Sequence, residues 1–576
     1  MSNRKRVWQT IIGVLIIVAY GMEIYFFFTI NKNPSEDAFI TFRFARNLAE
    51  GNGPVFNTGE PVEGYSNFLW MSFIAGAHKL GLDMISFSRF IGALCNTLTL
   101  FLTWYIPYRY FAIGGYCVLL GPLLYILFVP FHYTATIGLE TSAFTFLIIL
   151  STCLVIGAYD RPLRFALASV VFLLLALTRP EGNLYFGFFA GYLLVRWLLF
   201  RESIRPYIPG FIIFIAGYCL FMVWRYSYYH LLFPNTYYAK VSFPLFMRAA
   251  VGFVSLKGFF LHYPYLILFF LMFWRARKVC VNWRIMAPVV IFTGVGLIFN
   301  LFAGFEWMPF FRYVSPIVPL MIILCQIVFA SLWQTIADAS NAQRLVWRGI
   351  TLFCLVIAAE QFICDVAFNM RLKDFDAFAY NNQKFFGEWF KKEIGTEPMV
   401  CIGDVGRIAY FSEAKIMDIV GLTSREFATL RQKHGSPDLS LIPCSWSFNS
   451  YKNKERELLL KLKPDYVLLY NFRFRASDTF PGSNIGIAEY DDFKSNYEHL
   501  GSFSVIPKNT SPSWPKQYYY FEVVDLSSGL LAWINEGWGW GYEIYVRKDF
   551  PGKRFKIELY PDDRIKAITV TNADSK

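Results

Sequence analysis

The stretch that decides the fold is PSEDAFITFRFARN (residues 34–47), which follows the first long apolar segment of the chain. Ser35 is a good N-cap residue, and Glu36 and Asp37 then occupy the first helical turn. Gly51 suits the position just after the last turn. The pattern therefore predicts a helix that begins at Glu36 and ends just before Gly51.

The polar residues of this predicted helix share one stripe, formed by Glu36, Arg43, Arg46, Asn47 and Glu50. An interfacial helix with carboxylates at one end and guanidinium groups farther along suits both an acceptor hydroxyl and a phosphate. The helix dipole also keeps a carboxylate ionised, as a general base requires. A plainer interpretation is that the acids only complement the dipole. The pattern alone leaves both interpretations open.

The overall composition is that of a membrane protein. Hydrophobic residues make up 55% of the 576 residues and charged residues only 17%, and repeated apolar runs with few charges indicate several membrane spans. The first run follows a short basic segment (Arg4, Lys5, Arg6) without a later small-residue cleavage site, so we expect an uncleaved span with a cytoplasmic N-terminus. The net charge of +12 fits basic clusters beside spans. Nucleic-acid binding is not predicted, because no basic stretch with interleaved aromatics stands clear of the apolar runs.

Further apolar segments predict later spans, about eleven in total with the first. Their ranges are about 86–107, 113–130, 140–157, 164–178, 182–200, 208–231, 249–273, 285–303, 313–334 and 346–367. Residues 68–80 are apolar but too few for a crossing, so we expect a juxtamembrane helix in the interface. This choice places the basic loops in the cytoplasm, as the positive-inside rule requires. Those loops are 108–110, 160–164, 201–205, 275–278 and the stretch up to Arg348.

The same topology puts the polar loops marked by Pro and Gly on the outer side, together with Glu36 and Asp37. These loops supply further candidate site residues, namely Glu140, Arg179, Glu181, Asn235, Lys240, Glu306 and Arg312. Arginine suits phosphate because its fork matches phosphate oxygens, and a lone carboxylate at the edge of a span is costly unless paired or wet. Plainer interpretations stay open, such as an interface anchor for Arg179 and a turn for Asn235.

From about Arg371 the chain becomes polar. This predicts a membrane module (residues 1–370, with a first external loop at 31–85) and a soluble domain (371–576). Short β-rich runs and a strand–turn–helix pattern over 399–411 predict an α/β domain, placed outside by the odd number of spans. The GDVG turn in that pattern lacks the spacing of a dinucleotide fingerprint and the lysine of a P-loop.

The ten cysteines show no metal-ligand spacing. Most fall in apolar runs, where cysteine behaves as a small core residue. A bridge between Cys401 and Cys444 in the polar domain stays open. No metal site and no cofactor are predicted, although nothing in the sequence speaks against a divalent cation.

Several of these motifs together resemble a known family. Residues 36–49 and 55–70 resemble the first external loop of the GT-C superfamily of glycosyltransferases, most of all the branch with mycobacterial terminal arabinofuranosyltransferases. Supporting resemblances lie at residues 138–141, 178–182, 234–236, 307–309, 312–313 and 418–423. The family usually has two aspartates where this chain has Glu36 and Asp37. The acid pair is therefore kept while the identity of the base stays open, with Asp37 favoured.

The resemblance implies a polytopic α-helical membrane protein of the GT-C type with a C-terminal extracytoplasmic α/β domain, in the bacterial inner membrane. It implies an inverting glycosyltransferase that moves a sugar, arabinofuranose in the most similar branch, from a polyprenyl-phosphate donor to a glycan or glycoprotein acceptor. Asp37 or Glu36 is the implied base. The implied substrate contacts are Arg43, Arg46, Glu63, Tyr65, Asn67, Glu140, Arg179, Glu181, Asn235, Lys240, Glu306 and Arg312. The alternatives are a non-enzymatic transporter of lipid-linked sugar and an envelope assembly protein.

Overall fold

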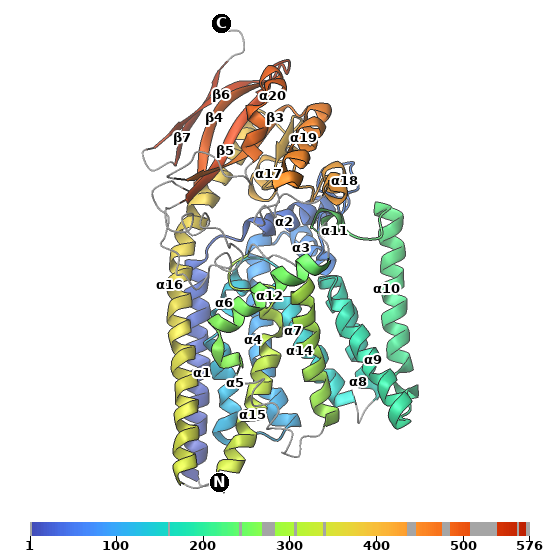
Figure 1. Cartoon of the computed structure of the whole chain (residues 1–576), viewed down its shortest axis with the longest axis vertical. Coiled ribbons are helices and arrows are strands. Elements are labelled where there is room, and N and C mark those ends of the chain that lie inside the picture. The colour runs from blue at the N-terminus through green and yellow to red at the C-terminus, as the bar shows by residue number, and fades with distance from the viewer. Residues whose placement is uncertain are drawn as a thin grey trace.

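In the computed structural model, a bundle of long helices stands below a smaller sheet domain, and two short helices lie between them (Figure 1). These short helices are α2 (Glu36–Ala49) and α3 (Phe68–Lys79). The structure describes residues 3–158, 162–240, 245–267, 283–303, 308–337, 341–434, 445–474, 484–506, 538–560 and 564–571.

The helical bundle matches the predicted spans. Within the described ranges, eight helices are long and apolar enough to cross a membrane. They lie in α1 (Asn3–Ile30), α4 (Met84–Tyr110), α7 (Thr141–Ala158), α9 (Gly182–Phe200), α10 (Ile208–Tyr229), α12 (Leu245–His262), α14 (Trp283–Ala303) and α16 (Asn341–Glu393). The other apolar helices are a pair bent by 52°, formed by η1 (Gly115–Leu119) and α5 (Leu120–Ile126) with α6 (Val129–Thr136), and the shorter α8 (Pro162–Thr178) and α15 (Val318–Ala337). Every predicted span has a helical counterpart, and the polytopic helical fold class is confirmed. Among the described residues, however, only eight of these helices, or nine with the bent pair, are long and apolar enough to cross, against about eleven predicted.

The helix predicted after the first span is α2. Its aromatic side chains Phe39, Phe42 and Phe44 are fully buried, because α2 is covered by α3 on one side and by the C-terminal domain on the other. Ser35 precedes the helix as predicted, but its side chain makes no capping hydrogen bond. Its hydroxyl instead lies 3.8 Å from the sulfur of Met308. α3 has 12 residues, which is too short to cross a bilayer.

The C-terminal domain is built on a mixed sheet, which confirms the predicted α/β class. Its strand order is β2-β1-β3-β5-β4. The bounds are β1 (Met399–Ile402), β2 (Lys415–Asp418), β3 (Tyr466–Phe474), β4 (Tyr497–Ile506) and β5 (Trp538–Arg547). β1 pairs in parallel with β2 and β3, whereas β5 is antiparallel to β3 and β4. β6 (Arg554–Leu559) and β7 (Ile565–Thr571) form a separate antiparallel pair.

The remaining helices of the described residues are not themselves candidate spans. They are α11 (Asn235–Lys240), α17 (Arg407–Ser412), α18 (Arg425–His434), α19 (Ser445–Leu462), α20 (Asp491–Asn496), η2 (Arg205–Tyr207), η3 (Pro264–Leu266), η4 (Ser315–Ile317) and η6 (Asn484–Glu489). β1 followed by α17 is the strand–turn–helix predicted over residues 399–411. α16 runs without a break through residue 370, where the sequence predicts a boundary. One continuous helix therefore connects the bundle with the sheet domain (Figure 1).

Candidate active site

The two adjacent acids at the start of α2 have different surroundings. Glu36 Oε1 accepts hydrogen bonds from the backbone N–H groups of Gly406 and Arg407, the latter at 3.2 Å. Burial under this turn and the neighbouring Asp404 raise the pKa of Glu36 well above its ordinary value. The Asp37 carboxylate makes no hydrogen bond or ion pair with any residue that the structure describes. Of the two acids, Asp37 is therefore the one whose carboxylate has no partner among the described residues.

Arg407 is a residue that the sequence reasoning missed. Its side chain is only 2% exposed and donates a hydrogen bond of 2.7 Å from Nη2 to the carbonyl oxygen of Pro34. It also forms an ion pair with Asp376 and a hydrogen bond to Gln383. The C-terminal domain thus binds the chain immediately before the acid pair. The GDVG turn that precedes Arg407 predicted the strand-to-helix connection, but nothing in it indicated this partner.

The arginines of α2 have a role that differs from the predicted one. The Arg43 guanidinium donates to three backbone carbonyl oxygens at 2.6–2.8 Å, those of Phe56, Ala409 and Ala414. Arg46 forms an ion pair of 2.8 Å with Glu413 and lies over the Tyr410 ring. These contacts use the guanidinium donors to join α2 to the C-terminal domain. Arg43 and Arg46 therefore do not fit the phosphate-binding role that their helical spacing suggested.

A polar network leads from the other side of α2 into the bundle. Thr41, one turn after Asp37, accepts a hydrogen bond of 3.1 Å from Asn67 Nδ2. The same amide nitrogen lies 3.0 Å from Glu140 Oε2. Glu140 Oε1 in turn lies 3.7 Å from Nε of Arg179. Three predicted site residues from separate loops, Asn67, Glu140 and Arg179, are thus brought together, and Thr41 connects them to α2.

Arg179, between α8 and α9, is the end of this network. Its Nε lies 2.7 Å from Glu181 Oε1, and its guanidinium lies over the rings of Phe144 and Tyr313, each at 5.3 Å. Its Nη1 is buried and has no hydrogen-bond partner among the described residues. Burial raises the pKa of Glu181, while Arg179 opposes this shift. A buried donor without a partner costs about 1–3 kcal/mol unless a ligand or water satisfies it.

Arg312 lies beside the same aromatic ring. Its guanidinium is 5.5 Å from the centre of the Tyr313 ring, and the interaction of Arg312 with Arg179 is electrostatically repulsive. Phe310 and Phe311 have φ angles of 63° and 51°. Non-glycine residues in this left-handed region cost on the order of 1–3 kcal/mol each and occur preferentially at functional sites. The strained turn places Arg312 close enough to Arg179 for the two positive charges to repel each other.

Glu63, Tyr65 and Asn235 form a second group. Glu63 Oε2 lies 2.6 Å from Nε of Arg225, a residue that was not predicted, and the hydroxyls of Tyr65 and Tyr229 are 3.0 Å apart. The Asn235 amide donates to three carbonyl oxygens of the C-terminal domain at 2.8–3.3 Å. Burial raises the pKa of Glu63 to about 7, although Arg225 opposes this. The group joins the first loop to α10, α11 and the C-terminal domain, so its members are placed as structural contacts.

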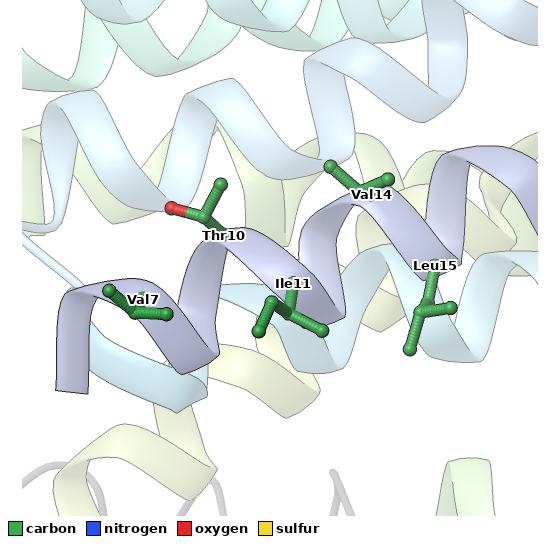
Figure 2. Close-up of a pocket in the computed structure, with 5 residues that line it drawn as sticks. All are labelled: Val7, Thr10, Ile11, Val14 and Leu15. Carbon is green, nitrogen blue, oxygen red and sulfur yellow. The ribbon is translucent and has the colours of Figure 1, made fainter. Parts of the chain in front are cut away.

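The other candidate residues lie elsewhere. Lys240 is exposed at the end of α11, and Glu306 lies outside the described residues. A shallow hollow of about 430 Å³ is lined by Val7, Thr10, Ile11, Val14 and Leu15 along one side of α1 (Figure 2). It is roughly 22 Å from the end of α1 that leads to α2, at 1.5 Å per residue. Because this apolar surface belongs to a candidate membrane span, we attribute it to contact with lipid.

Among the residues that the structure describes, no three His, Cys, Asp or Glu side chains gather in a way that could hold a metal ion. Cys401 is a buried free thiol in β1. Cys444, with which the sequence left a bridge open, lies outside the described residues.

Comparison with known proteins identifies relatives for parts of the chain. Residues 376–523 match a family described as a domain of unknown function (DUF8728). The chain is 27% identical over 254 residues to the terminal beta-(1->2)-arabinofuranosyltransferase of Mycobacterium tuberculosis. This alignment covers 41% of the chain and 38% of that protein. The chain therefore matches well under half of the length of this relative.

Solved structures show the fold. ArnT from Cupriavidus metallidurans bound to undecaprenyl phosphate has a TM-score of 0.50 at 13% identity, covering 71% of this chain and 85% of that one. Archaeal oligosaccharyltransferase AglB from Archaeoglobus fulgidus, in complex with an inhibitory peptide and a dolichol-phosphate, has a TM-score of 0.50 at 10% identity, covering 95% and 89%. The chain has the GT-C fold, and the resemblance found in its sequence is confirmed at that level.

Proposed function

We propose that the protein is an inverting glycosyltransferase that moves a sugar from a polyprenyl-phosphate donor to a glycan or surface-protein acceptor. The observation that carries this proposal is the presence of an unengaged carboxylate, Asp37, and of a buried arginine, Arg179, that has an unsatisfied donor. A network of Thr41, Asn67 and Glu140 runs from α2, one turn after Asp37, to Arg179. A base and an anion-binding group in one site are what such a transfer needs.

In the proposed reaction the Asp37 carboxylate accepts the proton of the acceptor hydroxyl. That oxygen forms a bond to the anomeric carbon as the bond from this carbon to the phosphate oxygen breaks. The electron pair leaves with the polyprenyl phosphate, and attack from the opposite face inverts the anomeric centre. A positioned base contributes typically about 10²–10⁴-fold to such a rate.

Arg179 and Arg312 are the proposed partners of the phosphate. Negative charge builds up on the leaving phosphate, and fixed cations in a site shielded from water stabilise it more than water would. The neighbouring Glu140 and Glu181 orient Arg179. They also oppose an anion, but burial raises the pKa of Glu181 and so favours its neutral form. Asp37 and Arg312 both lie within electrostatic reach of the Tyr133 hydroxyl, which supports one shared site.

The relatives support the class of donor. ArnT was solved with undecaprenyl phosphate and AglB with dolichol-phosphate, so a polyprenyl phosphate is the proposed carrier. The mycobacterial relative transfers arabinofuranose, which is the sugar we propose. The basic loops favour an orientation with α2, α3 and the C-terminal domain outside the bacterial inner membrane. The proposed division into a membrane module (1–370) and a soluble domain (371–576) follows the change in composition.

The test uses the purified full-length protein in lipid nanodiscs. Radiolabelled polyprenyl-phosphate arabinofuranose and a matched polyprenyl-phosphate hexose are each offered with an arabinan fragment and with a peptide. We expect a new glycosidic bond with the arabinose donor and the opposite anomeric configuration in the product. If the label stays on the lipid with every pair, or the intact lipid-linked sugar only changes leaflet in liposomes, the protein is not a transferase.

A further inference from the structure

We propose that Glu36 is a positioning residue, by which the C-terminal domain holds α2 so that Asp37 faces the substrate. This inference rests on the proposed function and assigns different roles to the two acids of the pair. It also gives the turn at residues 403–406 a role in holding the first turn of α2. The sequence predicted Glu36 and Asp37 as alternative bases.

The first argument is the hydrogen bonding of Glu36. Oε1 accepts from two successive backbone N–H groups, those of Gly406 and Arg407. A carboxylate oxygen that receives two backbone donors is held in direction as well as in distance. The same turn is fixed from the other side, because the Tyr542 hydroxyl in β5 donates to Asp404 at 2.9 Å. Glu36 therefore connects α2 to the rigid sheet of the domain.

The second argument is the fit at Gly406. A Cβ atom at this position would collide with the backbone oxygen and the carboxyl group of Glu36. The φ of Gly406 is −82°, so a left-handed backbone does not explain the glycine. Its role is to let the turn approach α2 closely.

The third argument is that Glu36 does not act alone. Arg407, the residue after Gly406, donates to the carbonyl oxygen of Pro34 at 2.7 Å and pairs with Asp376 of α16. The domain thus binds the chain on both sides of Ser35, at the entry to α2. Two attachments within three residues fix the direction of the first helical turn, on which Asp37 lies.

Glu36 is also poorly suited to be the base. Its pKa is raised by burial and by the nearby carboxylates of Asp404 and Asp37, with Arg407 opposing the shift. The backbone hydrogen bond from Gly406 also opposes the shift. A raised pKa leaves a smaller fraction of the carboxyl group ionised and able to accept a proton at a given pH. A neutral side chain with an oxygen in the same place should therefore accept the same two backbone N–H groups. Such a substitution tests whether Glu36 positions α2 or acts as the base.

The experiment compares Glu36→Gln with Glu36→Ala in the full-length protein in nanodiscs. The glutamine oxygen still accepts both backbone N–H groups, so we expect a kcat close to that of the wild type. Glu36→Ala loses the contact, and a shift of about 1 Å at a reacting group can cost about 100-fold in rate. We expect that loss in kcat with the donor KM unchanged. Glu50→Ala, an exposed acid at the other end of α2, is the control.

Gly406→Ala provides an independent variant, because it displaces the Glu36 carboxyl group without altering it. We expect it to lower kcat as Glu36→Ala does, whereas Gly76→Ala in α3, which has open space around its Cβ, leaves kcat unchanged. A Glu36→Gln enzyme as slow as Asp37→Asn, or a Glu36→Ala and Gly406→Ala pair with normal kcat, would overturn the inference. If wild type itself transfers no sugar, the proposed function has failed instead.

Discussion

Helix α2 presents one face to the C-terminal domain and another to the helical bundle. The polar groups on the two faces differ in whether they have partners within the protein. On the domain face, Glu36, Arg43 and Arg46 all have protein partners. On the bundle face, Asp37 has none among the described residues, and the network through Thr41 ends at an unsatisfied nitrogen of Arg179.

The difference shows how to separate structural from chemical charges. Charged groups on both faces carry a desolvation cost, which is tolerated only when hydrogen bonds or opposite charges offset it. On the domain face the protein supplies those partners itself. On the bundle face it leaves donors and an acceptor for a molecule that is not part of the chain. The comparison therefore assigns stability to the domain face and transfer to the bundle face.

The largest expected effect is that of Asp37→Asn. Asparagine keeps the shape of the side chain but cannot take the acceptor proton, so kcat should fall by about 10²–10⁴-fold. The thermal unfolding midpoint in detergent should stay the same, because no described residue pairs with Asp37. Near-normal turnover would remove the distinction between the two faces.

Arg179→Gln is expected to have the next largest effect. It removes a cation and several donors from the leaving phosphate, and loss of such stabilisation costs about 10²–10³-fold in rate. The matched control is Arg225→Gln, since Arg225 is also buried, also paired with a carboxylate and also has an unsatisfied nitrogen, Nη2. We expect Arg225→Gln to lower the unfolding midpoint while folded enzyme keeps its donor KM. Equal losses of transfer in both variants would show that loss of any buried arginine lowers the rate, whether or not it lies near the proposed phosphate site.

Arg43→Met tests the domain face. The change leaves three buried carbonyl oxygens without their donor, and each such group costs about 1–3 kcal/mol. We expect destabilisation by roughly 3 kcal/mol or more, measured by thermal unfolding and by faster proteolysis of the C-terminal domain. Lys384→Met on α16, whose side chain is 40% exposed, is the control. A variant that unfolds normally yet binds the donor lipid more weakly would show that Arg43 binds the phosphate after all.

The fold could be predicted to a large extent, because the information is local. Apolar runs and basic loops fix the spans, and the alternation of strand and helix signals fixes the class of the domain. The helix at α2 follows from Ser35, the acid pair and Gly51. Even there the local rule was incomplete, since Ser35 makes no capping bond and Glu36 binds backbone N–H groups of a remote turn instead.

The site could be predicted only as a set of residue types. Arg43 and Arg179 look alike in sequence, because each lies in an outer-loop segment that also contains acids. What separates them is whether carbonyl oxygens from residues more than 360 positions away occupy the donors, as they do for Arg43. Long-range contacts of this kind also explain why the sequence did not predict Arg407 and Arg225. Their partners lie far along the chain, at Pro34 and Glu63 respectively.

The smallest expected effect concerns Glu63, which lies among the structural contacts and therefore tests whether they affect transfer at all. Burial raises its pKa from 4.5 to about 7 in the folded protein. The folded state therefore holds this proton more tightly than the unfolded chain, so the associated stability is complete below pH 4.5 and is lost as pH rises through about 7. Glu63→Gln cannot titrate, so the difference in unfolding midpoint between about pH 5 and about pH 8 should shrink, while the rate of transfer per folded molecule stays unchanged. If Glu63→Gln instead alters the pH profile of kcat, Glu63 takes part in the transfer reaction. The structural contacts and the reacting groups would then not be separated as proposed.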